Sequence, residues 1–243
     1  MIYICSDIHG LYDRYLKLLD TIQLKEEDTL YVLGDMIDRG DRGIDILLDM
    51  MERKNVIPFL GNHEHMMLMH LFGYDTKSWL LENNGGKTTL EAFEKLSIDD
   101  KRRILHYLND SWVLKNLNIN GHRYSLSHIG VFTDTEDMRA DFSDPKTDVH
   151  ELQKMVWGMT PYALDRIIAY PEELCPTTFI SGHVITRRYS NSDDDEIISI
   201  PFENGCRYID IDCGCAAGEG YGQLACLTIN ETTGEIGDEI YIN

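Results

Sequence analysis

Hydrophobic and polar positions in the first third of the chain follow two alternating spacings. Short apolar runs at residues 2–5, 29–33 and 56–60 have the length and composition of buried strands. Apolar residues at helical spacing follow each run, within residues 11–22, 44–51 and 66–71. Strand, loop and helix repeated three times predict parallel strands joined by helical crossovers, and therefore an α/β fold.

The rest of the chain predicts more helices and strands of the same kind. Ser97 followed by Asp100 is typical of a helix N-terminus, and the helix should end near Leu108. Asn120-Gly121 predicts a type I′ hairpin between strands at 112–119 and 123–127. Short helices are expected at 149–156 and 163–169, and strands at 178–181, 207–211, 224–229 and 239–242. No repeat, linker or proline-rich boundary divides residues 1–243, so we expect one domain.

The composition narrows the classes of function. The net charge of −20 disfavours binding to nucleic acid, and an anionic substrate would need a local source of positive charge such as bound cations. No stretch approaches the roughly 20 apolar residues of a membrane span. The first residues lack the pattern of a signal peptide, and the six cysteines form no CxxC pair, so we expect a reduced, cytoplasmic protein that binds no membrane. The sequence indicates no oligomeric state.

Side chains that can bind metals or move protons follow each of the first three strands. These loops contain Asp7, His9, Asp35, Asp38, Asn62 and His63. Loops after consecutive parallel strands emerge at the same edge of a sheet, where ligand sites usually form. The Asp35 carboxylate has two oxygens and can bridge two cations held ~3.5–4 Å apart.

Two later histidines extend this pattern. His128 and His183 each follow a strand-like run and stand beside a glycine or one residue from it. A single aspartate or histidine in a loop is more often structural than a ligand. Metal-competent residues at five successive strand ends favour one shared site instead.

Three blocks of sequence resemble those of a known family. Ser6-Asp7-Ile8-His9-Gly10, Gly34-Asp35-Met36-Ile37-Asp38-Arg39-Gly40 and Gly61-Asn62-His63-Glu64 are similar to the blocks of the phosphoprotein phosphatase family of calcineurin-like metallophosphoesterases. Ser6 stands where that family usually has glycine. A later block, with Trp79, Asn83, Gly85, Gly86 and Thr89, is similar to one in prokaryotic members, and His128 and His183 match in order and spacing. The resemblance covers residues 2 to about 227.

The resemblance implies a fold, a metal centre and a set of ligands. The fold would be a four-layer β-sandwich flanked by helices, with a dinuclear site at the strand ends. One metal would be held by Asp7, His9 and Asp35, and the other by Asp35, Asn62, His128 and His183. Two divalent ions are expected, manganese first, with iron or zinc as alternatives, because the donors are nitrogen and oxygen without thiolates.

The resemblance also implies a mechanism. A hydroxide bridging the two metals would attack phosphorus. His63 would be the general acid for the leaving group, paired with Asp38, which would raise the pKa of His63. Arg39 would bind the phosphate through its forked guanidinium, although an ion pair that stabilises the loop is an alternative role.

Two positions depart from the protein phosphatases of this family. Leu60 and Met159 stand where those enzymes usually carry arginines, so two phosphate contacts would be missing. Each such contact is worth ~1.5–3 kcal/mol. Arg187 and Arg188 could replace them if their loop folds inward, but an exposed pair is the expectation.

The sequence therefore leaves three functions open. The leading interpretation is a Ser/Thr protein phosphatase or phosphomonoesterase, whose partner is a phosphorylated protein or a small phosphoester. The alternative is a diadenosine tetraphosphate-type hydrolase, which Leu60 and the segment Asp212-Cys213-Gly214-Cys215 resemble. Asp38-Arg39-Gly40 and Glu64 are closer to the phosphatases and tip the balance towards them. The third is an inactive metal-binding interaction module, against which all the predicted ligands and His63 argue.

Overall fold

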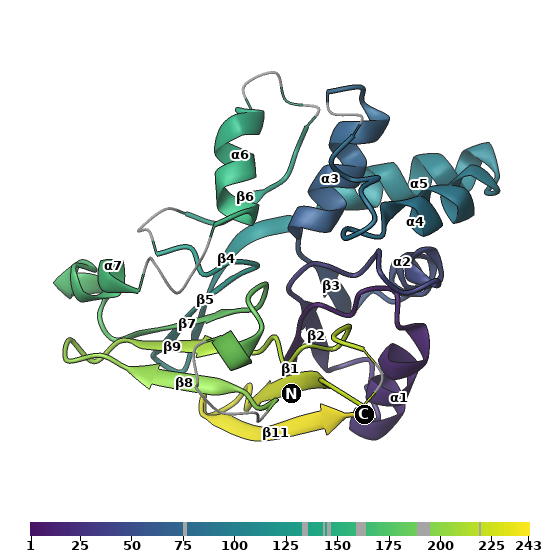
Figure 1. Cartoon of the computed structure of the whole chain (residues 1–243). Coiled ribbons are helices and arrows are strands. Elements are labelled where there is room, and N and C mark those ends of the chain that lie inside the picture. Colours follow the sequence, from purple (N-terminus) through teal and green to yellow (C-terminus); the bar gives the residue numbers. More distant parts are fainter. Residues whose placement is uncertain are drawn as a thin grey trace.

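Two mixed β-sheets form the centre of the molecule (Figure 1). The computed structural model describes residues 1–74, 77–132, 136–142, 144, 147–158, 164–188, 195–218 and 220–243. The first sheet has the order β11 (Ile236–Ile242), β10 (Leu224–Ile229), β1 (Ile2–Cys5), β2 (Thr29–Val32), β3 (Val56–Pro58). The second has the order β6 (Met138–Arg139), β4 (Trp112–Ile119), β5 (His122–Ser127), β7 (Thr177–Ser181), β9 (Arg207–Asp210), β8 (Ile198–Pro201).

The predicted parallel arrangement is confirmed for the first three strands. β1 pairs with β2, and β2 with β3, in parallel register. In the second sheet β5, β7 and β9 are also parallel neighbours. The carboxyl ends of these strands are therefore the ends from which the candidate ligands emerge.

The two faces of β1 explain why its sequence is apolar throughout. Ile2 and Ile4 pack with Leu126 and Ile180 of the second sheet, in the cluster between the sheets. Cys5 faces the opposite way, into the cluster formed with the helices. A strand buried on both faces has no polar side to alternate with, so its hydrophobic run is continuous.

Helices cover the outer faces of the sandwich. Figure 1 shows α1 (Tyr12–Ile22), α2 (Gly43–Glu52), α4 (Gly86–Glu94) and α5 (Ile98–Asn109) on one side of the sheets. α3 (Asn62–Leu71) follows β3, and α6 (Val149–Val156) packs near it. α7 (Asp165–Ile168) lies on the opposite flank, where Ile167 packs on Phe179 and Tyr208 of the second sheet. The predicted β-sandwich flanked by helices is confirmed.

Several boundaries differ from the sequence-based expectation. β3 ends at Pro58, because Phe59 bridges to Trp112 and the Leu60 amide donates to the Trp112 carbonyl at 2.7 Å. α3 begins at Asn62 and not near Met66, so a predicted ligand and His63 lie in its first turn. Strands β6 and β8 and helix α4 were not predicted. α4 follows Gly85, whose positive φ of 78° starts the helix without an ordinary N-cap residue.

The hairpin prediction is confirmed in detail. Asn120 and Gly121 both have positive φ, 49° and 87°, as a type I′ turn requires. Ile119 is then paired with His122 across β4 and β5. Among the described residues, none of the helices has the length and apolar character needed to cross a membrane.

Candidate metal centre

The six predicted ligand residues meet at the carboxyl ends of strands from both sheets. They are supplied after β1, β2, β3, β5 and β7, as Asp7, His9, Asp35, Asn62, His128 and His183. All are buried except His183, which is half-buried. Backbone hydrogen bonds continue past the ends of β1 and β2, from the Asp7 amide to Gly34 and from the His9 amide to Asp35. These bonds hold the first two ligand loops side by side.

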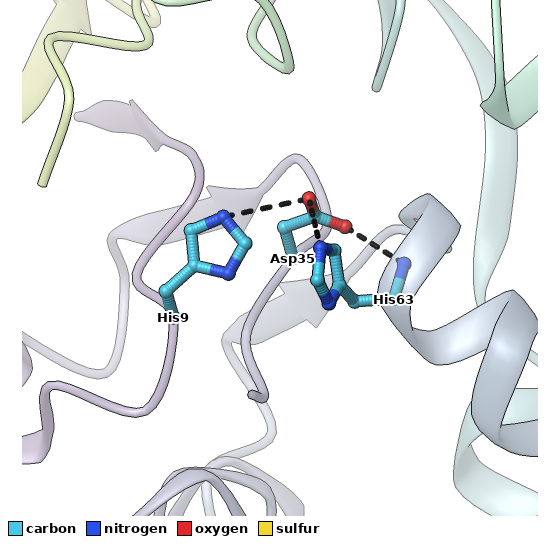
Figure 2. A group of neighbouring side chains, drawn as sticks. All are labelled: His9, Asp35 and His63. Carbon is cyan, nitrogen blue, oxygen red and sulfur yellow. Dashed lines mark hydrogen bonds and ion pairs between the residues drawn. The ribbon is translucent and has the colours of Figure 1, made fainter. Parts of the chain in front are cut away.

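Asp35 lies at the centre of this group, and its two carboxylate oxygens face different neighbours. Oδ2 lies 3.6 Å from His9 Nε2 and 3.9 Å from His63 Nε2, whereas Oδ1 lies 3.4 Å from His128 Nε2. Figure 2 shows His9 and His63 turned towards Asp35, with Oδ1 also accepting from the His63 amide at 3.1 Å. This is the geometry of a carboxylate that can bridge two cations.

Hydrogen bonds to backbone carbonyls orient two of the histidines. Nδ1 of His128 donates to the Leu33 carbonyl at 2.7 Å, and Nδ1 of His9 is 3.2 Å from the Ile37 carbonyl. Each ring is thereby held as the tautomer with its Nε2 lone pair facing the site. A carbonyl behind the ring is the usual support of a metal-binding histidine.

A metal site brings together lone pairs that repel one another when no cation lies between them, and the candidate ligands show this crowding. With the His128 proton on Nδ1, its Nε2 lone pair faces Asn62 Oδ1 at 3.1 Å and Asp35 Oδ1 at 3.4 Å. Three electron-pair donors then converge with no proton among them. One donor atom from each of Asp35, His128 and His183 lies within 4.8 Å of the others. On the other side of Asp35, His9 Nε2 lies 3.6 Å from Asp35 Oδ2 and 3.8 Å from Asp7 Oδ1. The residues present therefore fit two cations that share Asp35.

Asp7 is held at the edge of this group by its own contacts. Oδ2 accepts from the Ser6 hydroxyl at 2.5 Å and from the His183 amide at 2.9 Å, which leaves Oδ1 at 3.8 Å from His9 Nε2. Ser6, in place of the usual glycine, thus orients a predicted ligand. A Cβ at Gly182 would come within 2.3 Å of Asp7 Oδ2, so only glycine fits there.

His63 differs from His9 and His128 in the chemical group that contacts its Nδ1 atom. Its Nδ1 contacts Asp38 Oδ2 at 2.7 Å, a carboxylate instead of a backbone carbonyl. Asp38 is 0% exposed and is held by the Trp79 indole N–H at 2.7 Å and the Thr89 hydroxyl at 2.6 Å. The predicted His63–Asp38 pair is present, and Trp79 and Thr89 from the later block support it. Spacing in sequence could not assign that role to them.

The environment separates these groups by pKa. Burial raises the pKa of Asp35, but electrostatic attraction to the surrounding imidazoles, His128 first, outweighs burial and holds that pKa well below the ordinary value. Burial lowers the pKa of His9 and His128 and brings that of His183 to about 3, which favours the neutral, metal-binding form of each ring. Burial also opposes the charge on His63, but Asp35 and Asp38 raise its pKa above the ordinary value.

Left-handed backbone conformations gather at the same place. Asp7, His9, Asp35, Asp38, Arg39 and His183 all have φ between 49° and 72°. Non-glycine residues rarely adopt this conformation, and each instance costs of order 1–3 kcal/mol. Such strain persists where surrounding contacts enforce it, typically at functional sites. No periodicity in the sequence indicated it.

Arg39 lies at the mouth of the group. Its Nη1 is 2.7 Å from His9 Nε2 and its Nη2 is 3.4 Å from His63 Nε2, and the side chain is otherwise exposed. Neither contact is to a carboxylate, so among the described residues Arg39 is not engaged in the loop-stabilising ion pair considered as its alternative role. Its guanidinium is placed where a phosphoryl group would meet both histidines.

Glu64 has a structural role that its place in the third block did not disclose. The side chain is 0% exposed, and its two oxygens accept from the amides of Asp35, Met36, Ile37 and Gly61 at 2.8–3.2 Å. It thereby fastens the loop after β2 to the start of α3. Burial, with the charge of Asp35, raises the pKa of Glu64 to about 7.

The structure describes three of the four residues that bear on the missing arginines, which are Leu60, Met159, Arg187 and Arg188. Leu60 is buried in the helical core cluster, so its position contributes no cation to the site. Met159 lies outside the described residues. Arg187 is half-buried and pairs with Asp195, with Nη2 to Oδ2 at 2.7 Å, whereas Arg188 is exposed. The expectation of an exposed pair is therefore confirmed for Arg188 and wrong for Arg187, whose guanidinium is occupied by the ion pair with Asp195.

Asp212 is a further buried carboxylate beside the site. Its Oδ1 accepts from the Gly214 amide at 2.9 Å, and burial raises its pKa to about 6. Its negative charge also helps to raise the pKa of Asp7 well above the ordinary value, although burial is the larger cause. The sequence marked Asp212 only as part of a resemblance.

Comparison with known proteins identifies the family to which this fold and candidate site belong. The model of the calcineurin-like phosphoesterase family matches residues 1–187. Among curated proteins, symmetrical bis(5'-nucleosyl)-tetraphosphatases are similar: that of Acidovorax ebreus is 30% identical over 132 residues, 54% of this chain and 44% of the relative. That of Pseudomonas syringae pv. syringae is 28% identical over 114 residues, 44% of this chain and 37% of the relative. The matches span less than half of these relatives.

Solved structures share the fold at low sequence identity. A presumed diadenosine tetraphosphatase has a TM-score of 0.59 at 18% identity, over 99% of this chain and 92% of the other. A cold-active protein-tyrosine phosphatase of a Shewanella species has a TM-score of 0.56 at 14% identity, over 100% and 80%. A Ser/Thr phosphatase from Saccharomyces cerevisiae has 0.54 at 16%, over 99% and 79%.

These structural matches establish the architecture only, because identities below 20% leave the chemistry open. The match to the family model, in contrast, is a match of sequence, and it includes the blocks that contain the candidate site residues from Asp7 to His183. This chain is a member of the calcineurin-like phosphoesterase family.

Proposed function

We propose that this chain hydrolyses a phosphoric anhydride bond of dinucleoside polyphosphates. The observation that carries the choice is its similarity to curated symmetrical bis(5'-nucleosyl)-tetraphosphatases, 30% identical over 132 residues in one case. Buried Leu60 supports it, because the site lacks at that position the arginine expected of a protein phosphatase. The relatives thus favour the alternative over the protein-phosphatase interpretation that Asp38-Arg39-Gly40 and Glu64 suggested.

The described residues divide the work of such a reaction. Asp7, His9, Asp35, Asn62, His128 and His183 would hold two divalent cations. When bound, these cations supply an activated water and neutralise charge on the phosphoryl oxygens. Arg39, beside His9 and His63, would bind a phosphoryl oxygen through its fork.

His63 would complete the bond cleavage as a general acid. Asp38 holds Nδ1, so Nε2 points into the site and can give its proton to the oxygen that leaves as the P–O bond breaks. Asp38 also favours the protonated form of the ring. Trp79 and Thr89 keep the carboxylate in place, which fixes the direction of the proton transfer.

A phosphomonoesterase acting on phosphoserine is the second candidate. The buried His63–Asp38 pair favours it, because an alkoxide leaving group needs protonation more than a nucleotide phosphate does.

A substrate panel on one metal-loaded preparation separates the candidates. We expect diadenosine tetraphosphate to be cleaved to two molecules of ADP, with kcat/KM at least about tenfold above that for p-nitrophenyl phosphate or a phosphoserine peptide, a difference of ~1.4 kcal/mol in transition-state binding. Products are separated by anion-exchange chromatography, and metal content is measured on the same sample. A preference for the phosphoserine peptide would overturn the proposal in favour of the second candidate. If protein carrying two metals cleaved none of these substrates, the result would indicate the inactive metal-binding interaction module.

The role of His63 is tested by leaving-group dependence. His63→Asn should reduce kcat by about 10²–10⁴-fold for the phosphoserine peptide and much less for p-nitrophenyl phosphate, whose leaving group needs little protonation. Metal content should match the wild type, because neither proposed metal depends on His63. His106→Asn, at an exposed position of α5, is the matched control. An equal loss on both substrates would contradict the general-acid role.

A further inference from the structure

A pocket opens beside Arg39 and is formed by three loops. It has a volume of about 300 Å³ and is lined by Leu11, Arg14, Arg39, Gly40, Cys215 and Ala216. The first two loops touch through their glycines: the Gly40 amide donates to the His9 carbonyl at 2.9 Å, and a Cβ at Gly10 would lie 2.8 Å from the Gly40 backbone. The third wall is attached by Arg14, whose Nη1 donates to the Cys215 carbonyl at 2.5 Å. The walls are therefore fixed relative to the metal centre.

The two arginines of this pocket form no ion pair with a carboxylate among the described residues, as is also true of Arg123, Arg166, Arg188 and Arg207. Within the described parts of the chain, six other arginines form ion pairs with carboxylates: Arg42, Arg53, Arg102, Arg103, Arg139 and Arg187. The structure records no such pair for Arg14 or Arg39 among the residues that it describes, although the chain has 42 acidic residues. Two positive charges without a direct ion-pair partner in one pocket favour an anion there.

A neighbouring hollow shows the contrast. It has a volume of about 520 Å³ and shares Arg14, but Asp195 and Glu196 line it. Two carboxylates would repel a polyphosphate. Among the residues that the structure describes, none with a carboxylate lines the pocket beside Arg39, and Leu11 and Ala216 add apolar surface next to the charges.

We propose that this pocket binds the second phosphate of the substrate and the nucleoside attached to it, with Arg14 as the specificity-determining cation. The inference rests on the proposed function, since the scissile phosphate is placed at Arg39 and the metal centre. Arg39 would contact the phosphoryl group under attack, and Arg14 the next phosphate along the chain. A volume of about 300 Å³ is at the lower end of ligand pockets, which suits a phosphate and part of a nucleoside, not a whole dinucleotide.

Arg14 also anchors the loop of Cys215, so the test must separate charge from anchoring. Arg14→Gln keeps an amide donor for the Cys215 carbonyl but removes the positive charge. The inhibition constant of ADP against p-nitrophenyl phosphate hydrolysis should rise about tenfold or more, the weight of a charge-assisted hydrogen bond. The inhibition constant of inorganic phosphate should rise several-fold less, because phosphate occupies only the Arg39 side. Arg14→Lys should recover most of the ADP affinity, and Arg102→Gln on α5 is the control.

Two results would overturn the proposal. In the first, Arg14→Gln binds ADP like the wild type, which leaves Arg14 as a loop anchor only. In the second, it weakens ADP and inorganic phosphate by the same factor, which indicates a general disturbance of the site.

The measurement of ADP inhibition does not depend on which substrate the enzyme prefers. If the wild type failed to cleave diadenosine tetraphosphate, the proposed function would fall, yet ADP inhibition would still report on the pocket. For protein without any turnover, calorimetric titration of ADP into metal-loaded wild type and Arg14→Gln replaces the inhibition assay, with the same expected ratio.

Discussion

Asp35→Asn is expected to lose both metals and to lower kcat/KM by at least about 10³-fold, since changes behind the ligands alone cost 10–100-fold. The Asp35 oxygens face different sides, Oδ2 towards His9 and Oδ1 towards His128. An asparagine offers one oxygen and one amide nitrogen, and the amide nitrogen has no lone pair for a cation. Whichever way the amide turns, one side of the pair of sites loses its shared ligand and its negative charge.

The measurement is metal content per chain after dialysis, by mass spectrometry, alongside activity on p-nitrophenyl phosphate. Asp20→Asn, on the exposed face of α1, changes the same side chain where it contacts no part of the site and should retain wild-type metal. The fold should survive Asp35→Asn, because the asparagine oxygen can still accept from the His63 amide. A folded Asp35→Asn protein that keeps two metals would rule out the bridging role.

Glu64→Ala is expected to lower the free energy of unfolding by about 3–5 kcal/mol, because buried donors left without a partner cost ~1–3 kcal/mol each. Four backbone amides lose their acceptor when this carboxylate is removed. They belong to the loop that carries Asp35 and to the residue before α3, so the metal ligands would lose their common support.

Urea unfolding of the metal-free protein measures this effect without a contribution from bound cations. Glu91→Ala, at an exposed position of α4, is the matched control and should change stability by less than about 0.5 kcal/mol. Glu64→Gln keeps one oxygen acceptor and should fall between wild type and alanine, which preserves the test if the alanine variant does not fold. Stability equal to the wild type in both variants would show that the four hydrogen bonds are dispensable.

Much of the fold could be predicted because its signals are local. The apolar runs at 2–5 and 29–33, each followed by helical spacing, specify a strand and a crossover helix whatever surrounds them. Asn120-Gly121 specifies its turn because few other residues adopt positive φ at both positions. β6, with two residues, and β8, exposed on alternate positions, have no comparable pattern and form because a neighbouring strand offers them an edge.

The candidate ligands were also predictable, because each follows a strand and parallel strands end at one edge. What a side chain does there was not. His63 and His128 are both buried imidazoles after strands, and only the group behind each ring, the Asp38 carboxylate or the Leu33 carbonyl, separates the proposed acid from a proposed ligand. Trp79 and Thr89 reach Asp38 from 41 and 51 residues away.

The sequence by itself therefore determined the parallel α/β arrangement of the first three units, the hairpin and the residues that gather at the strand ends, since each depends on neighbours along the chain. Only the tertiary structure decided the tautomers of the histidines, the four amides that share Glu64, the positive φ values at the ligands and the pocket between Arg14 and Arg39. These depend on contacts between loops distant in sequence, whose distances are set by how the two sheets and their helices pack.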